Sequence, residues 1–219
     1  MKKKTLLLCL LCAIACTQLT GCTMTASDTA SSQTQTARQP QKAQPPAIQA
    51  DSEALSSQGL QAYQHFDYDK AISLYDKAID ADSNNYKAYS GKGIAMAMRG
   101  NATGNKSDVS SGIAYIQKAL SLYPEYVPTF YDLALACKIN GQYEIAIQYF
   151  KKVIAAEPDN TWSYYGIATI YGDKGQAPEA ISYLKKAIAL DPQAVKEAAR
   201  TQSHFDKIRS NADFQALLQ

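Results

Sequence analysis

The chain has 219 residues with 22 basic and 20 acidic side chains, which gives a net charge of +2. Lys2, Lys3 and Lys4 stand at the very start of the chain, and without these three residues the net charge is −1. The remainder holds no basic run with interleaved aromatic residues, so the composition argues against nucleic acid as a partner.

The N-terminal segment has the pattern of a targeting signal. The three lysines precede an apolar run of 11 residues, from Leu6 to Cys16. This run is too short to span a bilayer comfortably but is typical of a signal-peptide core. It leads to the sequence LTGC at residues 19–22, which resembles the lipobox of bacterial lipoproteins. The resemblance implies that residues 1–21 are removed and that Cys22 carries a lipid, which holds the chain on a membrane. An ordinary secretory signal or an uncleaved anchor is the alternative.

The cysteine count agrees with this interpretation. Cys9, Cys12 and Cys16 lie in the predicted signal peptide and Cys22 would carry the lipid, so only Cys137 remains for the mature fold. A single cysteine cannot form an internal disulfide. Because Cys137 lies on the apolar face of a predicted helix, we expect a small buried hydrophobic side chain there and no nucleophile.

The segment from residue 22 to residue 50 is a low-complexity stretch of Ala, Gln, Ser, Thr and Pro. Its only large apolar residues beyond Cys22 are Met24 and Ile48. Such a segment buries too little surface to offset the entropy lost on ordering. We expect a disordered tether with a root-mean-square reach of roughly 30 Å.

The rest of the chain repeats itself. Pro124, Pro158 and Pro192 recur at equal intervals. The small residues keep the same step, since the interval from Ala134 to Ala146 is the same as that from Ala168 to Ala180. Small side chains at fixed points of a helical pair indicate places where two helices cross closely.

This spacing resembles the tetratricopeptide repeat, whose unit is about 34 residues long. The resemblance implies an all-α fold, a right-handed solenoid of four helical hairpins followed by a C-terminal cap. The array would span residues 51–194, with repeats at about 52–85, 86–126, 127–160 and 161–194. Residues 195–219 would form the helical cap, because a solenoid otherwise exposes the packing face of its last repeat.

The second repeat is longer than the others. Its small residues, Gly93 and Gly112, are separated by seven positions more than Ala134 and Ala146 in the third repeat. The additional residues must lie within the turn-rich stretch 100–108. We expect an exposed loop at residues 101–107, with Asp108 as the N-cap of a helix that begins at Val109.

The sequence holds no constellation typical of catalysis. The two histidines, His65 and His204, lie at opposite ends of the array. The metalloprotease, P-loop and nucleophile-elbow motifs are missing from the sequence. We therefore expect no enzyme: no catalytic residue, no metal site, no cofactor and no small-molecule substrate.

In tetratricopeptide arrays the first helix of each hairpin lines a concave groove that binds peptides, and the resemblance implies the same here. In the first repeat the groove residues would be Ser56, Leu60 and Tyr63; in the second, Lys87, Ser90 and Ile94; in the third, Tyr131, Leu135 and Lys138; in the fourth, Trp162, Tyr165 and Thr169. Chaperone-type arrays hold a peptide carboxylate with basic and amide side chains at several of these places. Ser56, Leu60 and Tyr131 stand there instead, which favours an apolar, aromatic groove. The alternative is that some of the rings pack between repeats.

Together these patterns predict a lipid-anchored interaction scaffold of the bacterial cell envelope that binds a protein partner. A pilotin-like assembly factor for a secretin or pilus, an adaptor of cell-wall enzymes, and an enzyme or solute-binding lipoprotein are the alternatives. Thr23 follows the lipobox cysteine, where an aspartate would signal retention in the inner membrane. In a cell with two membranes this favours the outer membrane, facing the periplasm. In other cells the outer face of the cell membrane is expected.

Overall fold

The computed structural model describes residues 44–219, and every helix assigned within that range belongs to one continuous array. The predicted signal peptide, the predicted lipid on Cys22 and most of the predicted tether lie outside the described residues. At the start of the array, the backbone N–H of Gln49 donates to the Asp82 carboxylate, 2.9 Å away.

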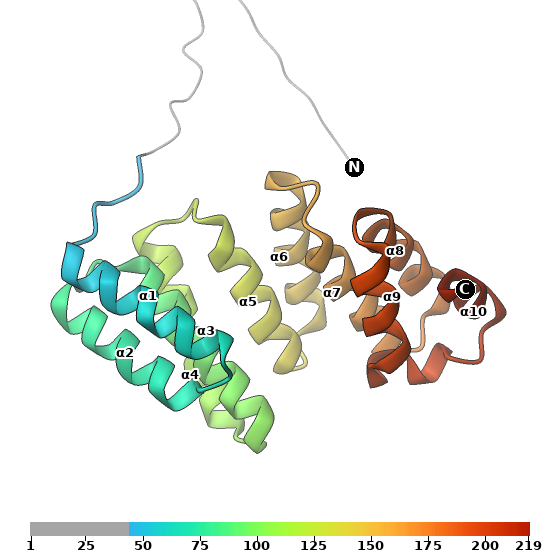
Figure 1. The fold of residues 1–219 in the computed structure, drawn as a ribbon, viewed down its shortest axis with the longest axis horizontal. Coiled ribbons are helices and arrows are strands. Elements are labelled where there is room, and N and C mark those ends of the chain that lie inside the picture. Colours follow the sequence, from blue (N-terminus) through green and yellow to red (C-terminus); the bar gives the residue numbers. More distant parts are fainter. Residues whose placement is uncertain (1–43) are drawn as a thin grey trace, which may run out of the picture. The chain divides into compact units, whose positions relative to one another are not determined.

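Four helical hairpins follow one another in chain order (Figure 1). They are α1 (Ala50–Gln64) with α2 (Tyr68–Ala81), α3 (Tyr86–Thr103) with α4 (Lys106–Leu122), α5 (Val127–Ile139) with α6 (Tyr143–Ala156), and α7 (Thr161–Asp173) with α8 (Ala177–Leu190). Each hairpin packs on the next through α2 and α3, α4 and α5, and α6 and α7. The prediction of an all-α solenoid of four hairpins is confirmed.

Polar caps and left-handed turns set the helix ends. The side chains of Asp67, Asn85 and Asn160 each accept a hydrogen bond from the backbone N–H three residues ahead, which satisfies a free donor at the helix start. Between the helices of the third and fourth hairpins, Gly141 and Gly175 have φ values of +75° and +73°. Glycine tolerates this conformation without a steric penalty, so it suits the turn between two helices.

The small residues of the repeat lie where the two helices of a hairpin cross. Ala146 and Ala180 are fully buried. In the second hairpin a β-carbon added to Gly93 would lie only 2.5 Å from the carbonyl oxygen of Gly112. Backbone approaches backbone at this point, so both positions require glycine, and the predicted role of the small residues is confirmed.

Replacing Ala146 with leucine should therefore overpack the third hairpin. We expect the free energy of unfolding to fall by about 1–3 kcal/mol, because three additional carbons have no free volume to occupy. Chemical denaturation followed by circular dichroism measures this loss. Ala155→Leu on the exposed face of the same helix is the matched control and should change stability little. Equal losses in the two variants would contradict the crossing.

The additional residues of the second repeat lengthen its helices, and the prediction of a loop is wrong. Helix α3 continues to Thr103, Gly104 turns the chain with φ +73°, and the side chain of Asn105 caps α4. Asp108 is therefore not the N-cap and α4 begins at Lys106, ahead of the predicted Val109. The carboxylate of Asp108 instead accepts from the guanidinium of Arg99, 2.8 Å away. One left-handed glycine and one asparagine cap suffice to close the hairpin, so the flanking residues stay helical.

Residues 101–107 are exposed, as predicted. Their deletion should join Gly100 to Asp108 and restore the spacing of the other repeats between Gly93 and Gly112. Gly100 would then occupy the turn position that Gly141 holds in the next repeat. We expect the melting temperature to stay within about 4 °C of that of the unaltered chain. A much larger loss would show that the protruding helix ends stabilise the array.

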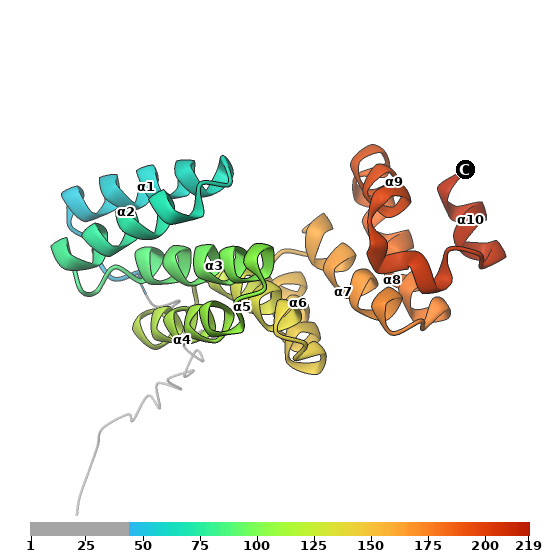
Figure 2. The ribbon, with the colours of Figure 1, turned by 90° about the horizontal axis from the view of Figure 1, so that it is seen from below.

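The C-terminal segment closes the far end of the stack. It consists of α9 (Pro192–Thr201), the 3-10 helix η1 (Ser203–Ile208) and α10 (Ala212–Leu218). Figure 2 shows α9 and α10 beside α8. Val195, Phe205 and Phe214 are buried against residues of α7 and α8. The predicted cap is confirmed, because these side chains cover the packing face of the last hairpin.

Candidate functional site

Two clefts open along the first helices of the hairpins. The N-terminal cleft, about 450 Å³ in volume, is lined mainly by α1, α3 and the start of α5. The C-terminal cleft, about 480 Å³, is lined mainly by α5 and α7, together with Gln202 and His204. The residues that the repeat register predicts for the groove divide between them. Ser56, Leu60, Tyr63, Lys87, Ser90 and Ile94 line the first, and Tyr131, Leu135, Lys138, Trp162, Tyr165 and Thr169 line the second. That they bind a partner stays a prediction.

These residues differ in how far they reach into solvent. Leu60 and Trp162 are 48% and 44% exposed, one in each cleft. Tyr165 and Thr169 are buried and form part of the cleft floor. The Tyr165 ring also packs edge-to-face on Phe205, with ring centres 5.8 Å apart. Tyr165 therefore both lines the cleft and joins the fourth repeat to the C-terminal cap, whereas Leu60 and Trp162 are free to contact a ligand.

A carboxylate that the groove prediction omits lies in the N-terminal cleft. The hydroxyl of Ser90 donates to Asp132 Oδ2 at 2.7 Å. Within the described part of the chain, Asp132 forms no ion pair and no second hydrogen bond. Burial raises the pKa of Asp132 to about 7, and the hydrogen bond from Ser90 opposes this shift. The carboxyl group is therefore half-ionised near neutral pH.

The register shows why Asp132 is unusual. Gly91 in the second repeat and Gly166 in the fourth stand at the equivalent position. A β-carbon on either glycine would clash with an aromatic ring, that of Tyr75 or that of Phe150. A position that is glycine in two repeats thus carries an acid in the third. An aspartate two residues before the crossing alanine was the signal in the sequence that could have identified this residue.

A lysine and a glutamate form an ion pair at the same cleft. Lys87 Nζ lies 2.7 Å from Glu53 Oε1, and both side chains are partly exposed. Glu53 Oε2 is buried and has no hydrogen-bond partner. The ion pair raises the pKa of Lys87. The cleft thus holds two carboxylates and one ammonium group, and that ammonium group pairs with Glu53.

The C-terminal cleft holds a lysine and an aspartate that are linked through a histidine. Lys138 Nζ lies 3.2 Å from His204 Nε2, and His204 Nδ1 lies 2.9 Å from both carboxylate oxygens of Asp173. Burial lowers the pKa of Lys138 to about 8, an effect that the charge of Asp173 opposes. At pH 7 Lys138 is still mostly protonated, so its ammonium group donates to Nε2 and the imidazole N–H donates to Asp173.

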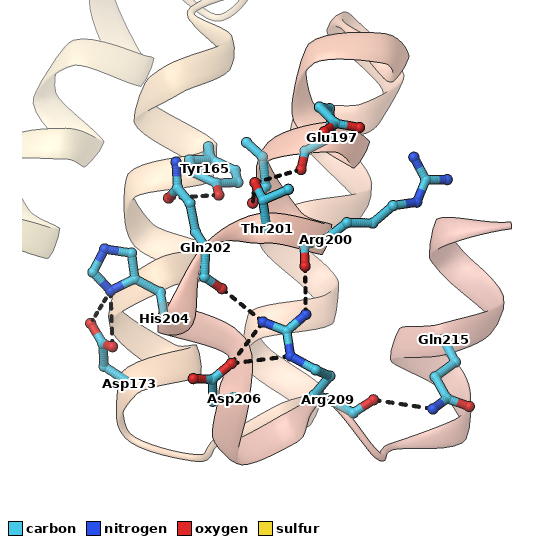
Figure 3. A network of polar contacts seen from close by, with 11 residues as sticks. Tyr165, Asp173, Glu197, Arg200, Thr201, Gln202, His204, Asp206, Arg209 and Gln215 are labelled. Carbon is cyan, nitrogen blue, oxygen red and sulfur yellow. Dashed lines mark hydrogen bonds and ion pairs between the residues drawn. The ribbon is translucent and has the colours of Figure 1, made fainter.

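The capping segment positions His204 for this contact (Figure 3). The Tyr165 hydroxyl donates to Gln202 Oε1 at 2.9 Å. The guanidinium of Arg209 donates to the carbonyl oxygens of Arg200 and Gln202, which fixes the bend between α9 and η1. The sequence predicts this segment only as a cap, yet Gln202 and His204 line the cleft. Nothing in the local pattern shows which repeat the bend would approach.

Within residues 44–219, His, Cys, Asp and Glu side chains do not gather in threes in a way that could hold a metal ion. The helices of this range also include none that is both long and apolar enough to cross a bilayer.

Comparison with protein families identifies the repeat. Three models described as tetratricopeptide repeat match residues 56–127, 115–148 and 139–203. A protein of Methanocaldococcus jannaschii, MJ0572, is 42% identical over 48 residues, which is 22% of this chain. The match covers 56% of that relative, so the chain spans about half the length of the curated protein it resembles.

Solved structures of MamA share the fold. One is 26% identical with a TM-score of 0.52 and covers 67% of this chain and 81% of its own. MamA from Desulfovibrio magneticus RS-1 is 20% identical with a TM-score of 0.54, over 78% and 96% of the two chains. A MamA structure designated AMB-1 is 21% identical with a TM-score of 0.55, over 78% and 98%. The matched models and the stacked hairpins together place residues 56–203 in the tetratricopeptide-repeat family.

Proposed function

We propose that this chain is an interaction scaffold that binds an extended segment of a protein partner across its two clefts. The observation that carries the proposal is the position of the clefts, which open along the first helices of successive repeats. Each cleft presents one large exposed apolar side chain, Leu60 or Trp162, beside polar groups. Such a side chain can anchor a peptide, while the polar groups select its sequence.

The scaffold proposal predicts which exposed residues matter. Replacing Leu60 and Trp162 together with alanine should weaken capture of the partner roughly tenfold or more, because truncated interface anchors commonly cost more than about 1 kcal/mol each. The measurement is quantitative crosslinking of the full-length protein in its own cells, followed by affinity measurement with the identified partner. Both residues are exposed, so circular dichroism should show an unchanged fold.

The chain offers a matched control for this experiment. Ile145 and Leu190 are each 42% exposed and lie outside both clefts. The Ile145→Ala, Leu190→Ala variant removes a similar apolar area from the second helices of the hairpins. Equal loss of capture in the two double variants would reject the clefts as the binding surface.

We further propose that a lipid on Cys22 anchors the scaffold in the bacterial cell envelope, on the outer membrane in a cell that has two. The sequence LTGC at residues 19–22 supports this proposal. Each CH₂ group of an acyl chain that enters the bilayer contributes about 0.8 kcal/mol, so two or three chains hold firmly. Mass spectrometry of the mature N-terminus should show acylated Cys22, and Cys22→Ala should abolish the modification. An unmodified N-terminus beyond residue 22 would refute the anchor.

A further inference from the structure

The N-terminal cleft contains a carboxylate whose hydrogen-bonding capacity the array uses only in part. Asp132 accepts one hydrogen bond, from Ser90, and its remaining acceptor capacity has no partner among residues 44–219. Equivalent positions in two other repeats are the glycines Gly91 and Gly166, so the fold does not require a polar side chain there. Asp132 is half-buried. A carboxylate that is partly removed from water without a counter-ion loses favourable solvation, and a cation supplied from outside would relieve that cost.

The described residues that line the cleft offer no free cation for this role. The ammonium group among these lining residues belongs to Lys87. It lies 2.7 Å from Glu53 Oε1 and forms an ion pair with that carboxylate. The buried second oxygen of Glu53 is itself without a hydrogen bond. The carboxylates therefore exceed the cations in this cleft by one, and the excess negative charge lies at Asp132.

Aromatic rings line the same space. Tyr63 and Tyr126 line the cleft and the buried Tyr75 forms part of its floor. Burial together with the charge of Asp132 raises the pKa of each phenol. The faces of tyrosine rings attract alkylammonium groups and pack against the methylene groups that carry them. A carboxylate beside several rings is suited to a cation on an alkyl chain more than to a bare metal ion.

We propose that the N-terminal cleft binds the alkylammonium group of a lysine side chain in the partner segment, with Asp132 as its counter-ion and Tyr63, Tyr75 and Tyr126 around its alkyl chain. This inference rests on the proposed scaffold function and names the chemistry of the partner. The C-terminal cleft holds the carboxylate of Asp173 together with the ammonium group of Lys138, so it has no excess negative charge and gives no reason to expect the same ligand.

The test uses n-butylammonium, which reproduces a lysine side chain without a peptide. We expect saturable shifts of the Ser90 and Ile94 amide signals when this probe is titrated into the isotopically labelled full-length protein. Butyrate, the anion of similar size, should produce none. Asp132→Asn keeps the shape and the acceptor for Ser90, yet should weaken binding at least tenfold. The control variant Asp80→Asn removes the same charge from an exposed position on α2 that lines neither cleft, and it should bind the probe normally.

The pH dependence provides a second readout. The affinity for n-butylammonium should rise between pH 6 and pH 8 as Asp132 ionises, and the Asp132→Asn variant should lack this rise. The other titratable groups near Asp132 are the Glu53–Lys87 ion pair, the three tyrosines and the neighbouring Tyr131. The pKa values of Lys87 and of all four tyrosines lie above their usual range. A flat profile in the unaltered protein would overturn the role of Asp132.

The outcomes separate this inference from the scaffold function. If Leu60→Ala, Trp162→Ala abolishes partner capture but n-butylammonium does not bind, the scaffold stands and the lysine site is refuted. Binding that butyrate reproduces, or that Asp132→Asn leaves intact, refutes the site equally. If the probe binds as expected but no partner is captured, the cation site stands and the scaffold function is the part that fails.

Discussion

Phe150→Ala should lower the free energy of unfolding by about 3–5 kcal/mol, the range found for a large aromatic residue removed from a packed core. Phe150 is 1% exposed and joins the third hairpin to the fourth. A β-carbon on Gly166 would lie 2.5 Å from its ring, and the Tyr131 ring packs edge-to-face on it with centres 5.6 Å apart. Chemical denaturation followed by circular dichroism measures the loss.

The same variant should also change how the array unfolds. In a solenoid each repeat is stabilised mainly by its neighbours, so a weakened junction allows the two sides to unfold separately. We expect a broader transition, or two transitions, for Phe150→Ala. Ile145→Ala on the same helix is the control, because this residue is 42% exposed and should cost less than about 0.5 kcal/mol. Similar losses for both residues would show that Phe150 does not hold the junction.

The repeat architecture could be predicted because its determinants are local and periodic. The spacing of Ala134 and Ala146 places small residues at a helix crossing, and Ala168 and Ala180 repeat that spacing in the next hairpin. All four alanines are fully buried. The register then assigns each residue of a first helix to one face, which is why the predicted groove residues lie in the two clefts.

The conformation of the additional residues in the second repeat could not be predicted from the repeat register. Its length and place follow from the spacing of Gly93 and Gly112, but its conformation does not. The stretch from Gly100 to Asp108 is rich in turn residues, yet it needs only Gly104 and Asn105 to reverse the chain. The remaining residues are compatible with a helix and are stabilised by continuing α3 and α4. Composition alone therefore overestimates the length of the loop.

Polar contacts between distant elements were beyond prediction for a different reason. His204 lies far from Lys138 in the chain and meets it only because the bend after α9 returns toward α7. Hydrogen bonds of Arg209 with the carbonyl oxygens of Arg200 and Gln202 set that bend. These contacts follow no period. Asp132 differs, since it lies within a repeat and departs from glycine at a known register position.

Asp132→Asn should stabilise the protein, and the gain should grow with pH. The folded state raises the pKa of this carboxyl group from 3.8 to about 7, mainly through burial. Below about pH 4 both folded and unfolded chains hold the proton, so the group has no effect on stability. Between about pH 4 and pH 7 the unfolded chain has lost the proton while the folded chain retains it, so stability falls as pH rises. Above pH 7 the cost is constant.

Asparagine removes this cost because it cannot ionise, and its side-chain oxygen can still accept from Ser90. One pKa unit corresponds to about 1.4 kcal/mol, so the gain should rise from near zero at pH 4 to at most roughly 4 kcal/mol above pH 7. Water in the cleft screens the charge and reduces the full figure. Urea denaturation of both proteins at pH 5 and pH 8 measures the change, with Asp80→Asn as the control for the loss of a charge. A pH-independent difference would mean that burial does not raise the pKa of Asp132.

If the cleft binds a lysine side chain as proposed, n-butylammonium should stabilise the unaltered protein at pH 8. It should leave the asparagine variant unaffected, because only the ionised carboxylate has an unfavourable free energy of burial that the cation can offset.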